Sequence, residues 1–162
     1  MIYSDPNCIP EELAVGKITG AGARKWVDVH YYEDLDNAIS VIRSKYKRIY
    51  ATHLGQSSQS LYNTNLTEPV ALMFGNEKNG ITEEALALVD GNFIIPQMGM
   101  VQSLNISVAC AVSMYEVLRQ RVEAGMYDHD YPEMSSFRSD LLTDYIVRSD
   151  DGHKGRSVIR HV

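Results

Sequence analysis

Residues 70–81 read Val-Ala-Leu-Met-Phe-Gly-Asn-Glu-Lys-Asn-Gly-Ile, and this stretch decides the fold class. Its first five residues are apolar without alternation, which is typical of a strand buried on both faces of a parallel sheet. A hexapeptide that begins and ends with glycine, residues 75–80, follows the apolar run and is typical of a turn. The stretch therefore predicts a strand covered on both faces of a parallel sheet, with a polar loop at its carboxyl end.

The segments on either side alternate between strands and helices. Residues 48–54 and 93–95 are short apolar runs and predict two further strands, and the polar, aperiodic residues 55–67 predict a loop. Helices are predicted over 34–46, from Thr82, and from Ser103 to a stop at Gly125. The long helix is expected to bury one apolar face, formed by Leu104, Val108, Ala111, Tyr115, Leu118 and Val122. This order of elements predicts an α/β fold with a mostly parallel sheet.

Length and composition narrow the class of protein. The 162 residues suit one compact domain, and the pattern predicts a main domain over 1–127 with an accessory segment, 128–162, that holds one helix near 136–147. No apolar run approaches the roughly 18 residues of a membrane span, and the first residues do not resemble a secretion signal, so a cytoplasmic location is expected. The two cysteines and five histidines lack the spacing of metal ligands, which predicts no metal site and two buried cysteines.

Charge is distributed unevenly along the chain. The net charge of −6 is unlike that of most nucleic-acid-binding proteins, yet residues 15–48 hold seven basic residues against four acidic ones. A solvated surface is the ordinary explanation of such a cluster. The alternative is that the cluster contacts phosphates, and Arg24 and Lys25 are then the candidate RNA-binding residues.

Three segments at the carboxyl ends of predicted strands are candidates for a site, because open α/β sheets bind ligands there. They are residues 51–54, 75–81 and 95–105. Each has a plain structural explanation when taken singly. The second could be an ordinary glycine turn, and Ser103 in the third could simply cap a helix.

The combination of the second and third segments is more specific than either alone. Phe-Gly-Asn-Glu-Lys-Asn-Gly-Ile at 74–81 is followed by Ile-Pro-Gln-Met-Gly-Met-Val-Gln-Ser-Leu-Asn-Ile-Ser-Val-Ala at 95–109. Together they resemble the second and third motifs of the SpoU family of SPOUT methyltransferases, and the likeness extends from about residue 25 to residue 127. Within that family, the sequence is most similar to enzymes that methylate the 2′-hydroxyl of a D-loop guanosine in tRNA.

The resemblance implies a fold, a cofactor and partners. The fold is a parallel sheet with a deep trefoil knot in its C-terminal part, and the cofactor is S-adenosyl-L-methionine (AdoMet). The partners are an RNA substrate, tRNA in the first place, and a second copy of the chain in a homodimer with a shared active site. The positions that match the family's cofactor-binding residues are Thr52, Leu54, Gly75, Ile95, Met98, Ser103 and Leu104.

Two further positions match the residues that act on the substrate. A ribose 2′-hydroxyl is a weak nucleophile at neutral pH, so positioning and proton transfer must carry much of the rate. Glu77 and Asn105 are the residues that the resemblance assigns to these catalytic roles. Their structural alternatives stay open: Glu77 as an ion-pair partner near Lys78, and Asn105 as a residue that satisfies the start of a helix.

One family motif departs from its expected place. The first motif of the family is an Asn followed six residues later by an Arg, ahead of the segment that matches Lys25-Trp26-Val27. Asn37 and Arg43 have this spacing but come later, in the predicted helix, so the chain is expected to lack the family's first strand and helix together with the catalytic arginine. Three alternatives follow: an inactive module that binds AdoMet or RNA, an rRNA 2′-O-methyltransferase, and a structural dimerisation domain.

Overall fold

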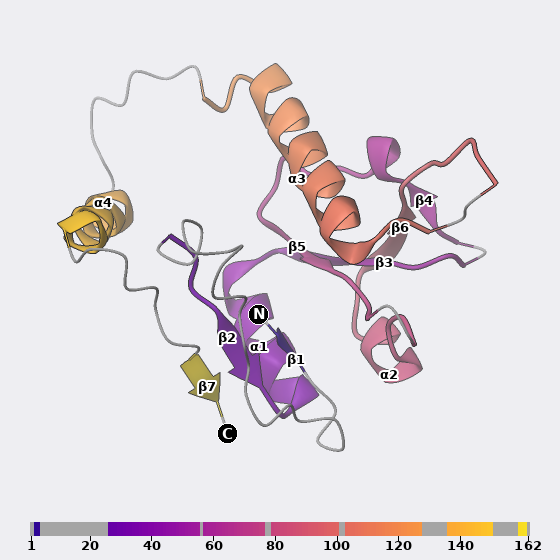
Figure 1. The fold of residues 1–162 in the computed structure, drawn as a ribbon, viewed down its shortest axis with the longest axis horizontal. Helices are drawn as coiled ribbons and strands as arrows, with labels where there is room; N and C mark the ends of the chain where they lie inside the picture. Colours follow the sequence, from indigo (N-terminus) through magenta and orange to yellow (C-terminus); the bar gives the residue numbers. More distant parts are fainter. Residues whose placement is uncertain are drawn as a thin grey trace. The chain divides into compact units, whose positions relative to one another are not determined.

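A computed structural model of the chain describes residues 2–3, 26–55, 57–76, 79–100, 103–127, 136–150 and 159–161 (Figure 1). The chain forms two compact units. One comprises Ile39–His129, and the other combines Met1–Ala38 with Asp130–Val162. The candidate segments at the strand ends all belong to the first of these, so that unit positions the site.

The Ile39–His129 unit is built on a four-stranded sheet in which every strand pair is parallel. Its strands in the order β4-β6-β3-β5 are Gln59–Ser60, Gly91–Ile94, Arg48–Thr52 and Val70–Met73. The α/β class and the three predicted strands are confirmed, with strand ends shifted by a few residues. The prediction that β5 is buried on both faces is wrong, because its four residues are half-buried and it lies at the edge of the described sheet. Strand β4 lies where only a loop was predicted, because two polar residues at a sheet edge carry no apolar signal.

The helices begin at recognisable caps. Helix α1 is Leu35–Lys45, α2 is Glu83–Leu86 and begins after the cap Thr82, and α3 is Ile106–Glu123. The prediction that α3 begins at Ser103 is wrong by a few residues, because Asn105 is the capping residue. The predicted stop is confirmed: Gly125 has a φ of 67°, a left-handed conformation that favours glycine. No helix in the described parts of the chain is both long and apolar enough to cross a membrane.

One face of this sheet packs against α3 and the 3₁₀ helix η3 (Leu61–Asn63). The centre of the core is Leu61, Leu66, Phe93 and Val117, and Tyr50, Leu72, Ile95 and Val112 pack around it. Leu61 and Leu66 lie in the predicted polar loop 55–67, yet both are completely buried. Isolated leucines in a polar segment give no periodicity, so the sequence alone did not reveal them.

The predicted buried face of α3 is wrong. Val108, Tyr115, Leu118 and Val122 are exposed by 47%, 74%, 45% and 51%, so an apolar stripe runs along the outside of the helix. The buried residues of α3 are instead Ser113, Glu116 and Val117. Helical periodicity identifies an apolar face but not what covers it.

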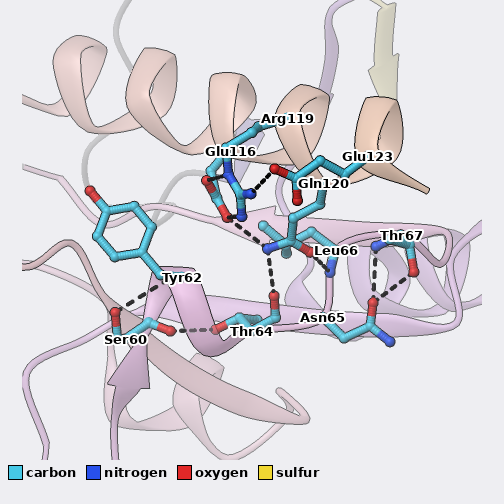
Figure 2. A network of polar contacts seen from close by, with 10 residues as sticks. All are labelled: Ser60, Tyr62, Thr64, Asn65, Leu66, Thr67, Glu116, Arg119, Gln120 and Glu123. Carbon is cyan, nitrogen blue, oxygen red and sulfur yellow. Dashed lines mark hydrogen bonds and ion pairs between the residues drawn. The ribbon is translucent and has the colours of Figure 1, made fainter. Parts of the chain in front are cut away.

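A polar network holds α3 against segment 61–68 (Figure 2). The Gln120 side chain accepts a hydrogen bond from the Leu66 backbone N–H at 2.9 Å and donates to the Thr64 carbonyl oxygen at 3.0 Å. Its amide also donates to the Glu116 carboxylate at 2.8 Å, and Arg119 donates to both oxygens of that carboxylate at 2.7 Å. The buried Glu116 carboxylate is thereby paired, which is what allows it to lie inside the structure.

Basic residues at the amino-terminal edge of the sheet are paired with carboxylates. Arg43 donates to Asp90 at 2.9 Å and to the Leu88 carbonyl oxygen, and Arg48 lies 3.8 Å from Asp90. Lys47 is 2.5 Å from Glu68. These residues of the basic stretch 15–48 therefore pair with carboxylates at this edge of the sheet, and the contact of the stretch with phosphates stays a prediction.

The carboxylates of Glu116 and Asp90, one buried and the other half-buried, make the free energy of unfolding depend on pH. The hydrogen bonds from Arg119 lower the pKa of Glu116 from its ordinary 4.5 despite burial. Burial opposes the charged form of Asp90, but hydrogen bonds from Ile49 and Arg43 outweigh it and lower the pKa of Asp90 from 3.8. Because folding favours the ionised forms, their stabilisation is complete above the unfolded pKa values and is lost as pH falls through the lower folded ones.

We therefore expect the urea midpoint of unfolding to fall steeply between about pH 5 and pH 3. Asp90→Asn should flatten this pH dependence, whereas Asp140→Asn, at an exposed position of the C-terminal helix, should leave it unchanged. Equal slopes for wild type and Asp90→Asn would contradict the role of Asp90.

The other unit contains a three-stranded parallel sheet in the order β1-β2-β7, formed by Ile2–Tyr3, His30–Tyr32 and Ile159–His161. Its helix α4, Ser136–Asp150, confirms the helix predicted near 136–147. Arg148 is buried and pairs with Asp28 at 3.2 Å and with Asp144, and the Trp26 and Tyr145 rings meet edge to face. These contacts join residues from both ends of the chain, while the domain boundary at residue 127 stays a prediction.

Candidate functional site

Three strand ends meet at the carboxyl edge of the sheet of the Ile39–His129 unit. Strand β3 lies between β6 and β5, and the register sets Thr52 opposite Phe93 and Ala51 opposite Met73. The residues that follow each strand, beginning with His53, Phe74 and Ile95, therefore leave from neighbouring positions on one edge (Figure 1). The prediction that the three segments come together is confirmed.

The end of strand β3 contributes Thr52, and the loop that follows it contributes Leu54. Thr52 is half-buried at the strand end, and its hydroxyl donates to the Met73 carbonyl oxygen of β5 at 3.3 Å. This bond ties the ends of β3 and β5 together. Leu54 is 71% exposed, so an apolar side chain stands open to solvent at this edge.

Strand β5 leads into a tight hairpin that contains Gly75. Asn76 and Gly80 exchange two backbone hydrogen bonds at 3.1 and 3.0 Å, and the Asn76 side chain accepts from the Asn79 N–H at 2.6 Å. A Cβ atom on Gly75 would lie 2.3 Å from the carbonyl carbon of Gly80. Glycine at position 75 is therefore required by the fold of the hairpin itself.

Strand β6 leads into the segment that contains the remaining cofactor candidates. Ile95 packs against the core, whereas Met98 is 98% exposed, and Ser103 and Leu104 are also exposed. The carboxyl edge of the sheet therefore carries three exposed apolar side chains, those of Leu54, Met98 and Leu104. The backbones of the loops at this edge follow the strands and add polar N–H and carbonyl groups. Such a combination suits an aromatic heterocycle, which needs apolar contacts and a few fixed donors and acceptors.

Asn105 is the capping residue of α3. Its side-chain oxygen accepts from the Ser107 N–H at 2.9 Å, which satisfies one of the free donors at the helix start. The structural alternative for Asn105 is thus present in the fold. The amide still lies at the end of the 95–105 segment, so a helix cap and a substrate contact are compatible roles.

A pocket of about 430 Å³ that is open to solvent adjoins the site. It is lined by Phe74, Ile106, Ser107 and Cys110, which come from the end of β5 and the first turns of α3. Sequence reasoning placed the first three inside family motifs but gave them no role, and it predicted Cys110 to be buried. That prediction is wrong, because Cys110 is exposed.

Some predicted residues cannot be placed against this geometry. Glu77, Arg24 and Lys25 lie outside the described residues, as does Cys8. Arg43, which has the spacing of the family's first motif, is described and lies at the opposite, amino-terminal edge of the sheet. Asn37 and Arg43 both lie in α1, which confirms the helix predicted over 34–46, whereas the absence of the family's first strand and helix stays a prediction.

The family described as the SpoU rRNA Methylase family matches residues 1–115, which include all three strand-end segments. The chain belongs to the SpoU family. SpoU-type relatives include the tRNA (guanosine(18)-2′-O)-methyltransferase of Thermus thermophilus, which is 46% identical over 110 residues, or 68% of this chain and 57% of that protein. The Escherichia coli enzyme of the same name is 45% identical over 107 residues, 66% of this chain and 47% of that protein. The chain thus spans about half the length of the curated relatives it matches.

Solved structures of the SpoU family share the fold. The TrmH/SpoU tRNA modifying enzyme of A. aeolicus superposes with a TM-score of 0.73 at 28% identity, over 94% of this chain and 74% of that one. The SpoU methyltransferase AviRb from Streptomyces viridochromogenes, solved with AdoMet, gives a TM-score of 0.52 over 57% of this chain and 38% of that one. At 22% identity this second likeness concerns the fold alone.

Proposed function

We propose that this chain carries the AdoMet-binding part of an RNA 2′-O-ribose methyltransferase that acts on tRNA, with a D-loop guanosine as the modified nucleotide. The observation that carries the proposal is the meeting of the three motif-bearing segments at one sheet edge. The names of the Thermus thermophilus and Escherichia coli relatives support the substrate. A cytoplasmic location, where tRNA is available, is part of the same proposal.

The residues at this edge fit AdoMet. Leu54, Ile95, Met98 and Leu104 offer apolar surface for the adenine, and the loop backbones offer amides and carbonyls for its polar edge. The Thr52 hydroxyl holds the end of β3 to Met73 of β5, and Gly75 allows the tight hairpin that follows β5. Both residues thereby shape the base of the proposed AdoMet site. AdoMet, when bound, supplies an electrophilic methyl group.

Asn105 and Glu77 are proposed to act on the RNA. The Asn105 carboxamide can orient the ribose while its oxygen caps α3, and the Glu77 carboxylate can accept a hydrogen bond or hold a basic group in place. Arg24 and Lys25 are proposed to contact RNA phosphates. Positioning of the 2′-hydroxyl would be the main contribution of these side chains.

Methyl transfer to a tRNA transcript tests the proposal, and two Asn105 variants separate its roles. Asn105→Asp keeps the capping oxygen and should retain the melting temperature, yet lose at least about tenfold in transfer because the amide donor is gone. Asn105→Ala should also cost about 1 kcal/mol of stability. Glu77→Ala should likewise reduce transfer. Full activity in Asn105→Asp and Glu77→Ala would contradict the assigned roles. Methylation of rRNA and not of tRNA would contradict the proposed substrate.

The position of Arg43 favours one alternative function. Because the arginine with first-motif spacing is paired with Asp90 at the far edge of the sheet, it does not supply the site. The alternative is a module that binds AdoMet or RNA without transferring a methyl group. It predicts AdoMet binding by calorimetry with no transfer to tRNA under any of the conditions in which TrmH-type relatives are active.

The trefoil knot and the homodimer complete the proposal. Strands β3 and β4 flank β6, so segment 53–58 has to cross β6 at the edge from which segment 95–105 departs, an arrangement compatible with the knot. The exposed stripe of α3, formed by Val108, Tyr115, Leu118 and Val122, is apolar surface that a second copy of the chain can cover.

A carboxylate in this stripe is expected to disrupt the homodimer. Leu118→Glu should shift the chain from dimer to monomer in light scattering, because a charge cannot be buried there without a partner. Leu142→Glu is the matched control, since Leu142 is a similarly exposed leucine on α4. A dimer that survives Leu118→Glu would contradict this interface.

A further inference from the structure

We propose that Ser58 is a positioning residue for AdoMet, acting through the loop that follows β3. The inference rests on the function proposed above. Ser58 lies outside the motifs that match the family and among the residues predicted as a plain loop. Its hydroxyl makes two hydrogen bonds that close this loop.

The Ser58 hydroxyl bonds to both the start and the middle of the loop. Ser58 Oγ donates to the His53 carbonyl oxygen at 2.6 Å and accepts from the Gly55 N–H at 2.9 Å. The Ser58 N–H donates in turn to the Gly55 carbonyl oxygen at 3.1 Å. One side chain therefore joins the start and the middle of the loop to its end.

The loop lies where the chain crosses β6. Because β3 and β4 pair with opposite sides of β6, residues 53–58 pass from one side of β6 to the other near the residue that precedes Ile95. The loop is tied to β6 through the His53 N–H, which donates to the Phe93 carbonyl oxygen at 3.3 Å. The Ser58 bonds join His53 and Gly55 to the end of the loop.

The loop contributes Leu54 to the proposed AdoMet site. Leu54 lies inside the ring that Ser58 closes, between His53 and Gly55, and its exposed side chain is one of the apolar groups proposed to contact the adenine. The ring of His53 also lies against Gly55, where an added Cβ would be 3.1 Å from His53 Cδ2. The Ser58 hydroxyl thus fixes the position of Leu54 relative to Ile95, the residue that follows the neighbouring strand β6.

Calorimetry with AdoMet on the full chain tests this inference with neighbouring serines as a matched pair. Ser58→Ala should raise the Kd for AdoMet about tenfold, in line with the loss of two hydrogen bonds. Ser57→Ala, at an exposed position that takes no part in these bonds, should leave the Kd unchanged. Ser58→Thr retains the hydroxyl and should restore the Kd to within about twofold.

Three outcomes would overturn the inference. One is wild-type affinity for AdoMet in Ser58→Ala, and another is an equal loss in Ser57→Ala and Ser58→Ala. The third is a Ser58→Ala chain in which AdoMet affinity falls only as much as the folded fraction, since the hydroxyl would then be merely structural. If the wild-type chain itself fails to bind AdoMet, the proposed function falls and takes this inference with it, a result distinct from the other three.

Discussion

Gly75→Ala is expected to have the largest effect of any single substitution at the site. The new Cβ would lie 2.3 Å from the Gly80 carbonyl carbon, and 2.6 Å from both the Gly80 oxygen and the Ile81 nitrogen. All three atoms are backbone, so no side chain can rotate to relieve the overlap, and the hairpin has to open. We expect a loss of about 3 kcal/mol in the free energy of unfolding and the loss of AdoMet binding.

Gly80→Ala is the control in the same hairpin. Gly80 has a φ of 68°, which an alanine adopts at a cost of about 1 kcal/mol, and nothing lies within 4 Å of the added Cβ. Urea unfolding and AdoMet calorimetry should therefore rank wild type, Gly80→Ala and Gly75→Ala in that order. A Gly75→Ala chain as stable as Gly80→Ala would show that the hairpin does not have the described geometry.

Gln120→Leu is expected to have the second large effect. The substitution leaves the Leu66 N–H and the Thr64 carbonyl oxygen without the partner that Gln120 provides, in residues that are 0% and 1% exposed (Figure 2). It also removes a donor from the Glu116 carboxylate. Because an unsatisfied buried polar group costs about 1–3 kcal/mol, we expect a loss of about 3 kcal/mol in the free energy of unfolding.

Gln59→Leu is the matched control for this substitution. Gln59 is exposed in the edge strand β4, so the same change of side chain should alter the free energy of unfolding by less than about 0.5 kcal/mol. Urea unfolding of both variants compares the two positions directly. Similar small losses in both would mean that the Gln120 network contributes little to holding segment 61–68.

The sequence predicted the sheet better than what packs on it. The apolar run at 70–74 and the turn after it predicted a parallel strand with a polar loop at its carboxyl end, because both are local patterns. The position of β5 at the edge of the described sheet depends on strand pairing, which is not a local pattern. The α3 stripe was assigned to the core, although the face that packs is the one holding Glu116 and Val117. That choice depends on the bonds between Gln120 and residues more than 50 positions away, which periodicity does not report.

Candidate site residues that lie in motifs could be predicted from the sequence. Residues proposed on the basis of a few hydrogen bonds could not. Thr52, Gly75 and Ile95 were found through the motifs and their order, and they do lie at one edge. Ser58 was missed because a serine in a polar loop has no distinguishing signal before its two hydrogen bonds are seen. Among the acid-sensitive groups, Asp90 was missed for the same reason, since its partners come from α1 and β3.

Titration of the full chain with AdoMet in a calorimeter is the most direct test of the central claim that the three strand-end segments form one cofactor site. We expect saturable binding of one AdoMet per chain and a rise in the melting temperature when AdoMet is present in large excess over its Kd. A folded chain that gives no binding heat and no change in melting temperature with excess AdoMet would contradict the claim.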